Sequence, residues 1–511
     1  MEPLPDWGTI PRMLHHQAGH HPDVPVLGTT TVRELADRAT RVARGLMSLG
    51  VRHGDRVAVW GVNDATWVEY AFGVWCAGAV IVPLSARYKG IEAEALLAKT
   101  GTEVVLVGSE GLAGLLPPMS GLRHTIGPGG TLARDELLAA AHDTPLHDAL
   151  ARALAVQPHD LCEIMSTSGT TGVPKGVMLD HAQVLRGYWD WAEIVTLRRG
   201  DRYPVIAPFA HGFGLNAGLL ACVLRLATMI PVPVFTPETV IDLIESGKVT
   251  VLAGAPAFFS RLLTELERAP RDLSSLRVAI CGAAAVPPAL VRRVLDEIGV
   301  ERMINAYGLM EGTVVSMTRA GDPVEVIAAT TGRPVPGIEV MIVDDDGKQV
   351  TDGERGEILQ RGYGVMRGYW DDPARTAEAI DGDGWLHTGD VGYLDAAGNV
   401  AIVDRKKELF IVNGFNVSPA EVESLLLREG SLAQAAVVGM PDERAGECGW
   451  AFVVPRPGVE VEADALVAWA RENMSSYKVP RRVFVVESLP VNANGKIDKL
   501  ALRASSAGER G

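Results

Sequence analysis

The chain has 511 residues and a formal net charge of −15, and these two numbers already exclude several classes of protein. At roughly 100–200 residues per domain, the length allows about three or four domain-sized units. Hydrophobic residues make up 47% and charged residues 22%, which is typical of a globular protein and excludes a disordered or fibrous chain. A net-acidic chain repels nucleic acids and anionic membranes, so we expect neither as a partner.

The five cysteines and the N-terminal sequence indicate a reducing, cytoplasmic setting. The cysteines are scattered, odd in number and never in a CxxC pair, so we expect neither a disulfide framework nor a zinc site. The N-terminal sequence is acidic and has no basic segment before an apolar core, so no signal peptide is expected.

Two long apolar stretches resemble membrane spans in composition but carry polar residues within them. Glu69 interrupts the stretch 67–84, and Asn216 and Arg225 interrupt the stretch 213–235. Because a charge in the middle of a span is costly in lipid, we interpret both stretches as buried core and expect no membrane span.

Helix and strand signals alternate in the first part of the chain. Apolar residues recur at steps of three and four between 32 and 49, which predicts an amphipathic helix that Gly50 ends. A strand is predicted at 56–60, then an apolar helix and a second strand at 80–83. This βαβ unit implies a parallel sheet covered by helices, and similar alternation recurs from about residue 180 to 315.

The pattern changes near residue 335. Short strands joined by hairpins are predicted at 339–343 and 356–360, and turn residues are dense up to about Val403. This part of the chain therefore reads as a small β-rich subdomain.

A compact segment of helices and strands follows Asp404. Ser418 and Glu421 have capping-box spacing, with Pro419 at the first helical position. Strands are predicted at 435–440, 449–455 and 482–487, and a helix near 462–473. We predict an α/β fold with a large N-terminal domain of helix-covered sheets plus the β-rich subdomain (1–404), and a small α+β C-terminal domain (405–511).

The strongest local signal is the segment 166–176, Ser-Thr-Ser-Gly-Thr-Thr-Gly-Val-Pro-Lys-Gly. Glycines let several backbone N–H groups point at one anion, the hydroxyls add donors, and Lys175 adds a positive charge. The segment suits a polyphosphate, although a flexible polar loop has a similar composition. It is not a Walker A loop, because Pro174 precedes Lys175 and the required spacing fails.

This segment resembles the phosphate loop of the adenylate-forming superfamily, which includes acyl- and aryl-CoA synthetases, firefly luciferase and the adenylation domains of peptide synthetases. Further motifs in the same order extend the resemblance over nearly all of the chain. The resemblance implies an AMP-forming acid–thiol ligase with ATP, magnesium and CoA. A small-molecule carboxylate attacks the α-phosphate, pyrophosphate leaves, and the CoA thiol then takes the acyl group. It also implies that the C-terminal domain moves between the two steps. The sequence leaves open whether the enzyme forms a homodimer.

The resemblance assigns roles in the phosphate loop and in the motif Pro208–Gly214. The expected ATP contacts in the loop are Thr167, Ser168, Gly169, Thr170, Thr171 and Gly172. Lys175 and His211 are expected to be catalytic, with His211 lining the acyl pocket and meeting the adenylate. A lone histidine between apolar residues is otherwise a packed core group.

A third motif pairs residues 282–285 with residues 305–312 and predicts the adenine site. Small residues let a flat adenine approach the backbone, Tyr307 can stack on it, and Asn305 offers amide hydrogen bonds. Glu311 suits a magnesium ion that bridges phosphates, with Thr170 as a second ligand. The expected nucleotide contacts here are Gly282, Ala283, Ala284, Asn305, Ala306, Tyr307, Gly308 and Met310.

Met310 departs from the family pattern, which has a threonine whose hydroxyl contacts the α-phosphate. One phosphate donor is therefore missing. Either Thr313 or a hydroxyl of the phosphate loop substitutes, or adenylation is weakened.

The resemblance also assigns five residues in the last third of the chain. Asp390 is expected to accept hydrogen bonds from both ribose hydroxyls, and Arg405 to contact the ribose. Lys407 matches the hinge pivot, and Gly414 lies beside the tunnel for the CoA thiol. Lys496 is expected to bridge the substrate carboxylate and the α-phosphate during adenylation.

The acyl-substrate pocket is expected at Trp189, His211, Gly212, Asn216, Gly282 and Gly308. Gly212 leaves space there, and the segment 208–235 resembles mycobacterial-type synthetases that activate the propionate side chain of degraded sterol rings. We expect a bulky apolar acid that is alicyclic and steroid- or terpenoid-derived. A medium- or long-chain fatty acid is the direct competitor. A stand-alone adenylation enzyme that loads a carrier protein and a non-catalytic nucleotide-binding relative also stay open.

Overall fold

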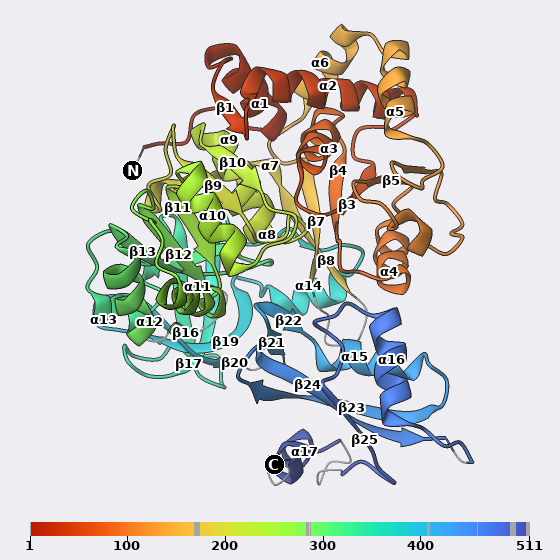
Figure 1. The fold of residues 1–511 in the computed structure, drawn as a ribbon, viewed down its shortest axis with the longest axis vertical. Helices are drawn as coiled ribbons and strands as arrows, with labels where there is room; N and C mark the ends of the chain where they lie inside the picture. The colour runs from red at the N-terminus through yellow and green to blue at the C-terminus, as the bar shows by residue number, and fades with distance from the viewer. Residues whose placement is uncertain are drawn as a thin grey trace. The chain divides into compact units, whose positions relative to one another are not determined.

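The structure is a computed structural model, and its residues fall into two compact units that are described separately (Figure 1). It describes residues 2–167, 174–282, 286, 288–405, 409–456, 458–490 and 497–506. The first unit comprises Met1–Ala86, Leu97–Ser166 and Gly176–Asp404. The second unit comprises Arg87–Leu96, Thr167–Lys175 and Arg405–Gly511.

A seven-stranded sheet in the order β18-β8-β7-β4-β3-β5-β6 forms the centre of the first unit. The pairs β3–β4, β3–β5, β4–β7 and β5–β6 are parallel, which confirms the predicted βαβ arrangement. Its strands are β3 (Arg56–Gly61), β4 (Val80–Ser85), β5 (Val104–Val107), β6 (His124–Ile126), β7 (Leu161–Thr167), β8 (Lys175–Asp180) and β18 (Gly368–Tyr369).

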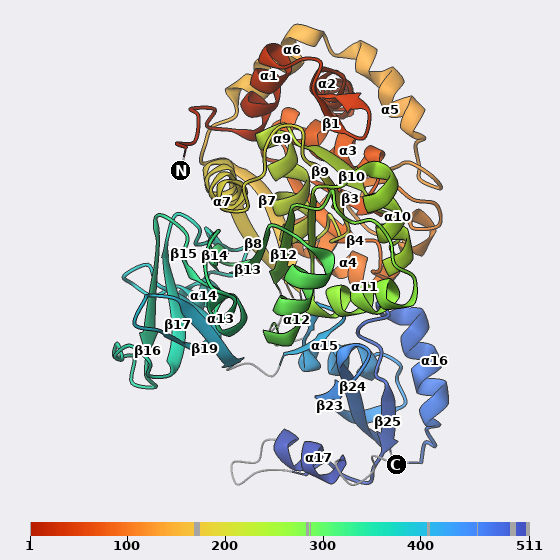
Figure 2. The same ribbon diagram turned by 60° about the vertical axis from the view of Figure 1, so that its left-hand side comes forward.

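Three further sheets belong to the same unit. Figure 2 shows β16, β17 and β19 side by side, and the antiparallel pairing of β16 with β17 confirms the predicted hairpin region. The strand orders are β2-β1-β10-β9, β11-β12-β13-β14-β15 and β16-β17-β19-β20. Their strands are β1 (Pro25–Leu27), β2 (Thr30–Thr31), β9 (Arg202–Val205), β10 (Thr228–Pro231), β11 (Val251–Gly254), β12 (Val278–Gly282), β13 (Arg302–Leu309), β14 (Thr313–Met317), β15 (Arg333–Pro334), β16 (Ile338–Val343), β17 (Gly356–Gly362), β19 (Leu386–Leu394) and β20 (Val400–Arg405).

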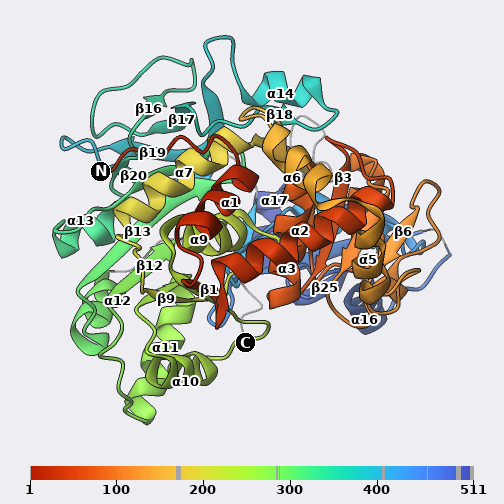
Figure 3. The same cartoon turned by 90° about the horizontal axis from the view of Figure 1, so that it is seen from above.

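Helices cover these sheets, and the predicted amphipathic helix is α2 (Val32–Ser48). Thr31 caps it in a reciprocal capping box with Glu34, and Gly50 follows its end with φ of +84°. Seen from above, α1 and α2 lie together, and α7 lies beside α9 (Figure 3). The other helices are α1 (Ile10–His20), α3 (Ala65–Cys76), α4 (Gly90–Thr100), α5 (Arg134–Ala140), α6 (Leu146–Ala155), α7 (His181–Ile194), α8 (Gly212–Gly214), α9 (Ala221–Arg225), α10 (Pro237–Gly247), α11 (Pro256–Arg268), α12 (Pro288–Arg293), α13 (Val324–Ala329) and α14 (Pro373–Ala379). Short 3₁₀ or π segments are η1 (Ala113–Leu115), η2 (Ala141–Asp143), η3 (Leu215–Leu220) and η4 (Val294–Ile298).

The two long apolar stretches are core elements, as predicted. The first forms α3 and β4, and Trp67, Tyr70 and Trp75 of α3 are fully buried. The second forms α8, η3, α9 and β10, whose residues are also largely buried. Within the described ranges, every helix is too short or too polar to cross a membrane.

The second unit is a small sheet in the order β22-β21-β24-β23, with β25 paired to β24, covered by helices. The predicted strands and helices of the C-terminal part are confirmed. Its elements are β21 (Phe410–Val412), β22 (Phe415–Val417), β23 (Leu432–Asp442), β24 (Gly446–Pro455), β25 (Arg482–Val485), α15 (Pro419–Leu427), α16 (Ala463–Asn473) and α17 (Lys499–Ser506). Ser418 caps α15 by accepting the backbone N–H of Glu421, as its spacing predicts.

A buried charge cluster fastens the segment Arg87–Leu96 to the rest of the second unit. The ammonium group of Lys478 donates to Glu92 at 2.6 Å and to Glu421 at 2.7 Å, and all three side chains are at most 4% exposed. Ser475 donates to Glu92 from its backbone N–H and its hydroxyl. Desolvation works against the lysine charge, but the nearby Glu421, Tyr477 and Glu92 keep the pKa of Lys478 well above its ordinary value. One cation therefore neutralises two carboxylates that are 57 and 386 residues away in the chain.

Replacing Lys478 with alanine should destabilise the second unit strongly. The change leaves two buried carboxylates without their cation, which costs about 3–5 kcal/mol. Calorimetric unfolding should therefore show a lower transition midpoint, whereas Lys348→Ala, at a side chain that is 77% exposed, should shift it little. Adding Glu92→Gln and Glu421→Gln to Lys478→Ala should recover part of the loss. Equal midpoints for Lys478→Ala and Lys348→Ala would show that the cluster does not hold the segment.

Candidate active site

The predicted phosphate loop connects β7 and β8, which are neighbouring strands of the central sheet. Thr167 is the last residue of β7, and its buried hydroxyl has no hydrogen-bond partner among the described residues. Lys175 is the first residue of β8 and is buried. Ser168, Gly169, Thr170, Thr171 and Gly172 lie outside the described residues. Ligands of open α/β sheets bind at the carboxyl ends of parallel strands, which is where Thr167 lies.

The strand β13 carries most of the predicted adenine-site residues. Gly282 ends the neighbouring strand β12 and pairs with Ala306. A Cβ atom at Gly282 would lie 2.8 Å from the carbonyl oxygen of Ala306, so only glycine fits. Gly308 is equally constrained, because a Cβ atom there would lie 2.3 Å from the carbonyl oxygen of Thr313. Ala283 and Ala284 lie outside the described residues.

Asn305 has a structural task that its sequence motif did not reveal. Its side-chain amide donates to the carbonyl oxygens of Ile327 at 3.1 Å and Thr330 at 2.9 Å. Both N–H bonds of the amide are therefore committed to the end of α13. Hydrogen-bond donors for adenine must therefore come from other groups, because Asn305 is only 5% exposed and both of its amide N–H groups already have acceptors.

Tyr307 and Asp390 meet, although 83 residues separate them in the chain. The hydroxyl of Tyr307 donates to Oδ2 of Asp390 at 2.6 Å, and both residues are 7% exposed. The part of β19 before Asp390 is braced against β17, because Gly389 donates its N–H to Glu357 and the Thr388 hydroxyl donates to the carbonyl of Ile358. The expected adenine-stacking ring and the expected ribose carboxylate are thus held in one hydrogen-bonded pair.

Two further predicted ribose and hinge residues can be placed only in part. Arg405 is the last residue of β20, and its side chain is not described. Lys407 lies outside the described residues.

Glu311 lies in the turn between β13 and β14 and is suited to a metal ion. The hydroxyl of Tyr369 donates to Glu311 Oε1 at 2.9 Å, and Met366 donates its N–H to the Glu311 carbonyl at 2.8 Å. Burial and the charge of Glu311 raise the pKa of Tyr369, so this tyrosine stays a donor at neutral pH. One oriented carboxylate fits magnesium, which takes its remaining ligands from phosphates and water.

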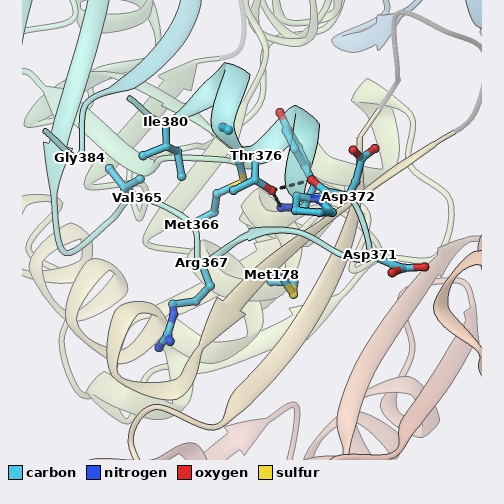
Figure 4. Close-up of a pocket in the computed structure, with 12 residues that line it drawn as sticks. Met178, Val365, Met366, Arg367, Asp371, Asp372, Thr376, Ile380 and Gly384 are labelled. Atoms are coloured by element: carbon cyan, nitrogen blue, oxygen red, sulfur yellow. Dashed lines mark hydrogen bonds between the residues drawn. The ribbon is translucent and has the colours of Figure 1, made fainter. Parts of the chain in front are cut away.

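An open groove of about 640 Å³, lined in part by Tyr369, lies around α14 (Figure 4). The Thr376 hydroxyl accepts the N–H of Tyr369 and donates to the carbonyl of Asp372, both at 2.9 Å. None of the site residues that the sequence singled out lines this groove.

His211 lies at the start of α8 and can donate a hydrogen bond. The residue is exposed, yet the protein around the imidazole lowers the pKa of His211 by desolvation, which favours the neutral ring. The Nδ1 atom accepts the backbone N–H of Phe213 at 3.1 Å. The ring proton is therefore on Nε2, which is a donor.

Gly212 lies where three side chains converge closely. A Cβ atom at Gly212 would lie 3.1 Å from the sulfur of Met310, 3.7 Å from the hydroxyl of Tyr188 and 4.0 Å from the amide nitrogen of Asn216. Met310 thus faces this predicted acyl pocket. Even a methyl group at position 212 would press on the Met310 sulfur, so the close packing favours glycine.

Trp189 lies elsewhere than predicted. Its indole N–H donates to the carbonyl of Glu2 at 2.9 Å, its ring contacts Trp7, and the guanidinium of Arg225 is 3.5 Å from its centroid. Successive residues of a helix point in directions about 100° apart. The preceding residue, Tyr188, therefore has the place near Gly212 that we expected for Trp189.

Glu163 is a site candidate that the sequence analysis missed. It lies in β7, is fully buried, and accepts a hydrogen bond from the Asn216 amide at 2.8 Å. Burial raises its pKa to about 7, although the hydrogen bond from Asn216 works in the opposite direction. A charged residue type inside an otherwise apolar central strand was the signal that could have revealed it.

In the second unit, Gly414 lies in a two-residue turn between β21 and β22. Asn413 and Gly414 have φ of +51° and +83°, which is the pattern of a type I′ hairpin. Backbone conformation alone therefore favours glycine at position 414. Lys496 lies outside the described residues.

Two family models match the sequence. The model described as AMP-binding enzyme matches residues 14–370, and the model described as AMP-binding enzyme C-terminal domain matches residues 421–496. Together they cover both units.

Curated relatives and solved structures agree with this match. A 3-[(3aS,4S,7aS)-7a-methyl-1,5-dioxo-octahydro-1H-inden-4-yl]propanoyl:CoA ligase of Rhodococcus jostii is 43% identical over 97% of this chain and 98% of its own length. The Mycobacterium tuberculosis protein of the same name is 42% identical over 98% of this chain and 99% of its own. The solved structure of an amide bond synthetase from Marinactinospora thermotolerans has a TM-score of 0.84 at 28% identity, covering 97% of this chain and 99% of that one. The chain belongs to the AMP-binding enzyme family, and within it to the AMP-forming acid–thiol ligases, which use ATP, magnesium and CoA.

Proposed function

We propose that this ligase activates a bulky, ring-bearing carboxylic acid of the kind that sterol degradation produces. The observation that carries the proposal is the similarity to two curated ligases over nearly the whole chain, at 43% and 42% identity. The Rhodococcus and Mycobacterium relatives, which are named for a fused-ring propanoyl group, support the same substrate class.

The first step converts the carboxylate into a mixed anhydride with AMP, because a free carboxylate is a poor acyl donor. Negative charge builds on the transferred phosphate, so oriented donors and cations should supply most of the catalysis. We assign the phosphate contacts to Thr167, Lys175 and the loop between them, and the carboxylate–phosphate bridge to Lys496. Magnesium, when bound at Glu311, would supply further positive charge to the phosphates.

The pair Tyr307–Asp390 is assigned to the nucleoside. The hydrogen bond between them fixes the tyrosine ring, which can then stack on adenine without losing side-chain entropy on binding. Asp390 is assigned to the ribose hydroxyls and Arg405 to the ribose.

A phosphate-loop hydroxyl is the better substitute for the family threonine at position 310. The Thr313 hydroxyl faces two glycines instead, since Cβ atoms at Gly187 and Gly364 would lie 3.5 and 2.7 Å from it. The hydroxyls of Thr167 and Thr313 both have no partner among the described residues, but Thr167 directly precedes the phosphate loop and is therefore the candidate. Met310 is then free to serve the acyl pocket.

The second step transfers the acyl group from AMP to the thiol of CoA. No protein nucleophile is needed, and burial raises the pKa of Cys76, Cys162, Cys222 and Cys281, which disfavours their thiolates. His211 donates from Nε2 and is assigned to the acyl carbonyl. We assign Gly414 to the thiol path and Lys407 to the hinge.

A panel of carboxylic acids tests the proposed substrate class. With fused-ring propionic acids, kcat/KM for pyrophosphate release should be at least about tenfold higher than with straight-chain acids of similar carbon number. The contacts of one hydrophobic pocket can discriminate between two substrates by that factor. The measurement is coupled pyrophosphate detection, with CoA or a carrier protein as acceptor. A preference for straight chains would favour a fatty acyl ligase, and no pyrophosphate with any acid would leave only a nucleotide-binding relative.

Replacing Gly414 with asparagine tests whether position 414 serves the thiol path or only the hairpin turn. Asparagine tolerates positive φ, so the hairpin should form, while its side chain obstructs the thiol path. We expect unchanged ATP–pyrophosphate exchange and a fall in acyl-CoA formation of roughly tenfold or more. Gly458→Asn is the matched control, because Gly458 has φ of +79° with nothing within 4 Å of an added Cβ. If both variants form acyl-CoA at the wild-type rate, Gly414 serves only the turn.

A further inference from the structure

We infer that Glu163, Asn216 and Tyr188 form a polar subsite at the inner end of the acyl pocket that binds a distal ketone or hydroxyl oxygen of the acyl group. The inference rests on the proposed function, because it concerns the acid that the ligase activates. It assigns the subsite to residues on β7, η3 and α7.

The three side chains lie close together. The Asn216 amide donates to Oε1 of Glu163 at 2.8 Å, and the Tyr188 hydroxyl and the Asn216 amide both approach Gly212. Asn216 lies in the π-helical segment η3, a geometry that is frequent at functional sites. The group is buried, with exposed fractions of 0% for Glu163, 1% for Asn216 and 6% for Tyr188.

Two oxygen atoms of this group have no partner among the described residues. They are Oε2 of Glu163 and Oδ1 of Asn216. Buried polar atoms are satisfied in more than nine of ten cases, so two orphans on adjacent side chains indicate a missing partner. That partner carries its own polar atom and reaches a place that is otherwise closed to bulk water.

The subsite lies at the correct end of the pocket. Glu163 and Thr167 are four residues apart on β7, so they face the same side of the sheet about 13 Å apart. Thr167 borders the phosphate loop, where the acid's carboxylate reacts. The amide of Asn216 is 4.0 Å from a Cβ atom at Gly212, the residue after His211. An acid that extends along this face of β7 from Thr167 therefore reaches Glu163.

The polar atoms of this group favour an acyl group that carries an oxygen atom at its far end over one that ends in a hydrocarbon. Burial favours the protonated form of the Glu163 carboxyl, and this form can donate from Oε2 to a ketone. A hydroxyl group can in addition donate to Oδ1 of Asn216. An apolar chain end would leave both atoms unsatisfied, which costs affinity.

A matched pair of acids tests the subsite. We expect wild-type kcat/KM for a fused-ring propionic acid with a ring ketone to exceed that of its deoxygenated analogue by at least about tenfold. Glu163→Leu should abolish this ratio, because leucine offers no polar atom to the ring oxygen. Glu163→Gln keeps both a donor and an acceptor, so it should preserve the ratio. If ring acids are poor substrates, the comparison uses the best acid of the panel in oxygenated and deoxygenated forms.

The outcomes separate this inference from the proposed function. Equal turnover of both acids by the wild type, or a preference that survives in Glu163→Leu, overturns the subsite while the ligase activity stands. Turnover of neither acid contradicts the proposed function instead.

The proton on Glu163 can be tested without any substrate, even if Glu163→Leu fails to fold. A folded-state pKa of about 7, above the ordinary 4.5, means that the wild type loses stability as pH rises from about 4.5 to 7. The neighbouring Tyr188 and Cys162 have raised pKa values and stay neutral over this range. The melting temperature of Glu163→Gln minus that of the wild type should therefore increase between pH 5 and pH 8. A difference that stays constant with pH contradicts a protonated Glu163.

Discussion

A single strand, β7, constrains the whole site, because it holds a buried carboxyl at one end and the phosphate loop at the other. Glu163 cannot ionise freely in the middle of a parallel sheet, and the hydrogen bond from Asn216 satisfies only one of its two oxygens. The fixed rise of a strand places Glu163 and Thr167 about 13 Å apart. In the subsite that we propose, the cost of leaving a buried polar group unsatisfied favours an acid with an oxygen atom near Glu163.

The nucleotide side of the site depends on hydrogen bonds between different sheets. Tyr307 on β13 donates to Asp390 on β19, and Tyr369 on β18 donates to Glu311. Each bond joins a neutral donor to a carboxylate, which is stronger than a bond between neutral groups. These pairs orient groups before any ligand binds, so less of the binding energy is lost in ordering side chains. In the second unit, Lys478 plays a corresponding structural part by joining Glu92 and Glu421.

Much of the fold followed from sequence, and the exceptions have physical causes. The α2 stripe, the βαβ unit and the C-terminal strands were predictable because hydrophobic periodicity and capping residues act locally. Asn305 and Trp189 were placed in ligand sites by motif, but their side chains are committed to Thr330 and Glu2, contacts that only tertiary structure creates. Glu163 was missed because its partner is 53 residues away. The sequence motif explains the glycine at position 414 by a tunnel for the CoA thiol, whereas the positive φ of this residue by itself favours glycine.

The most direct measurement is a crystal structure of the ligase with a hydrolysis-resistant adenylate analogue of a keto-bearing, fused-ring propionic acid. The account predicts the ring ketone within hydrogen-bonding distance of Glu163, about 2.6–3.0 Å, with the phosphate at the loop after Thr167. It also predicts the adenine on Tyr307. A ring system that turns away from Glu163, with ordered water filling the space beside Asn216, would contradict it.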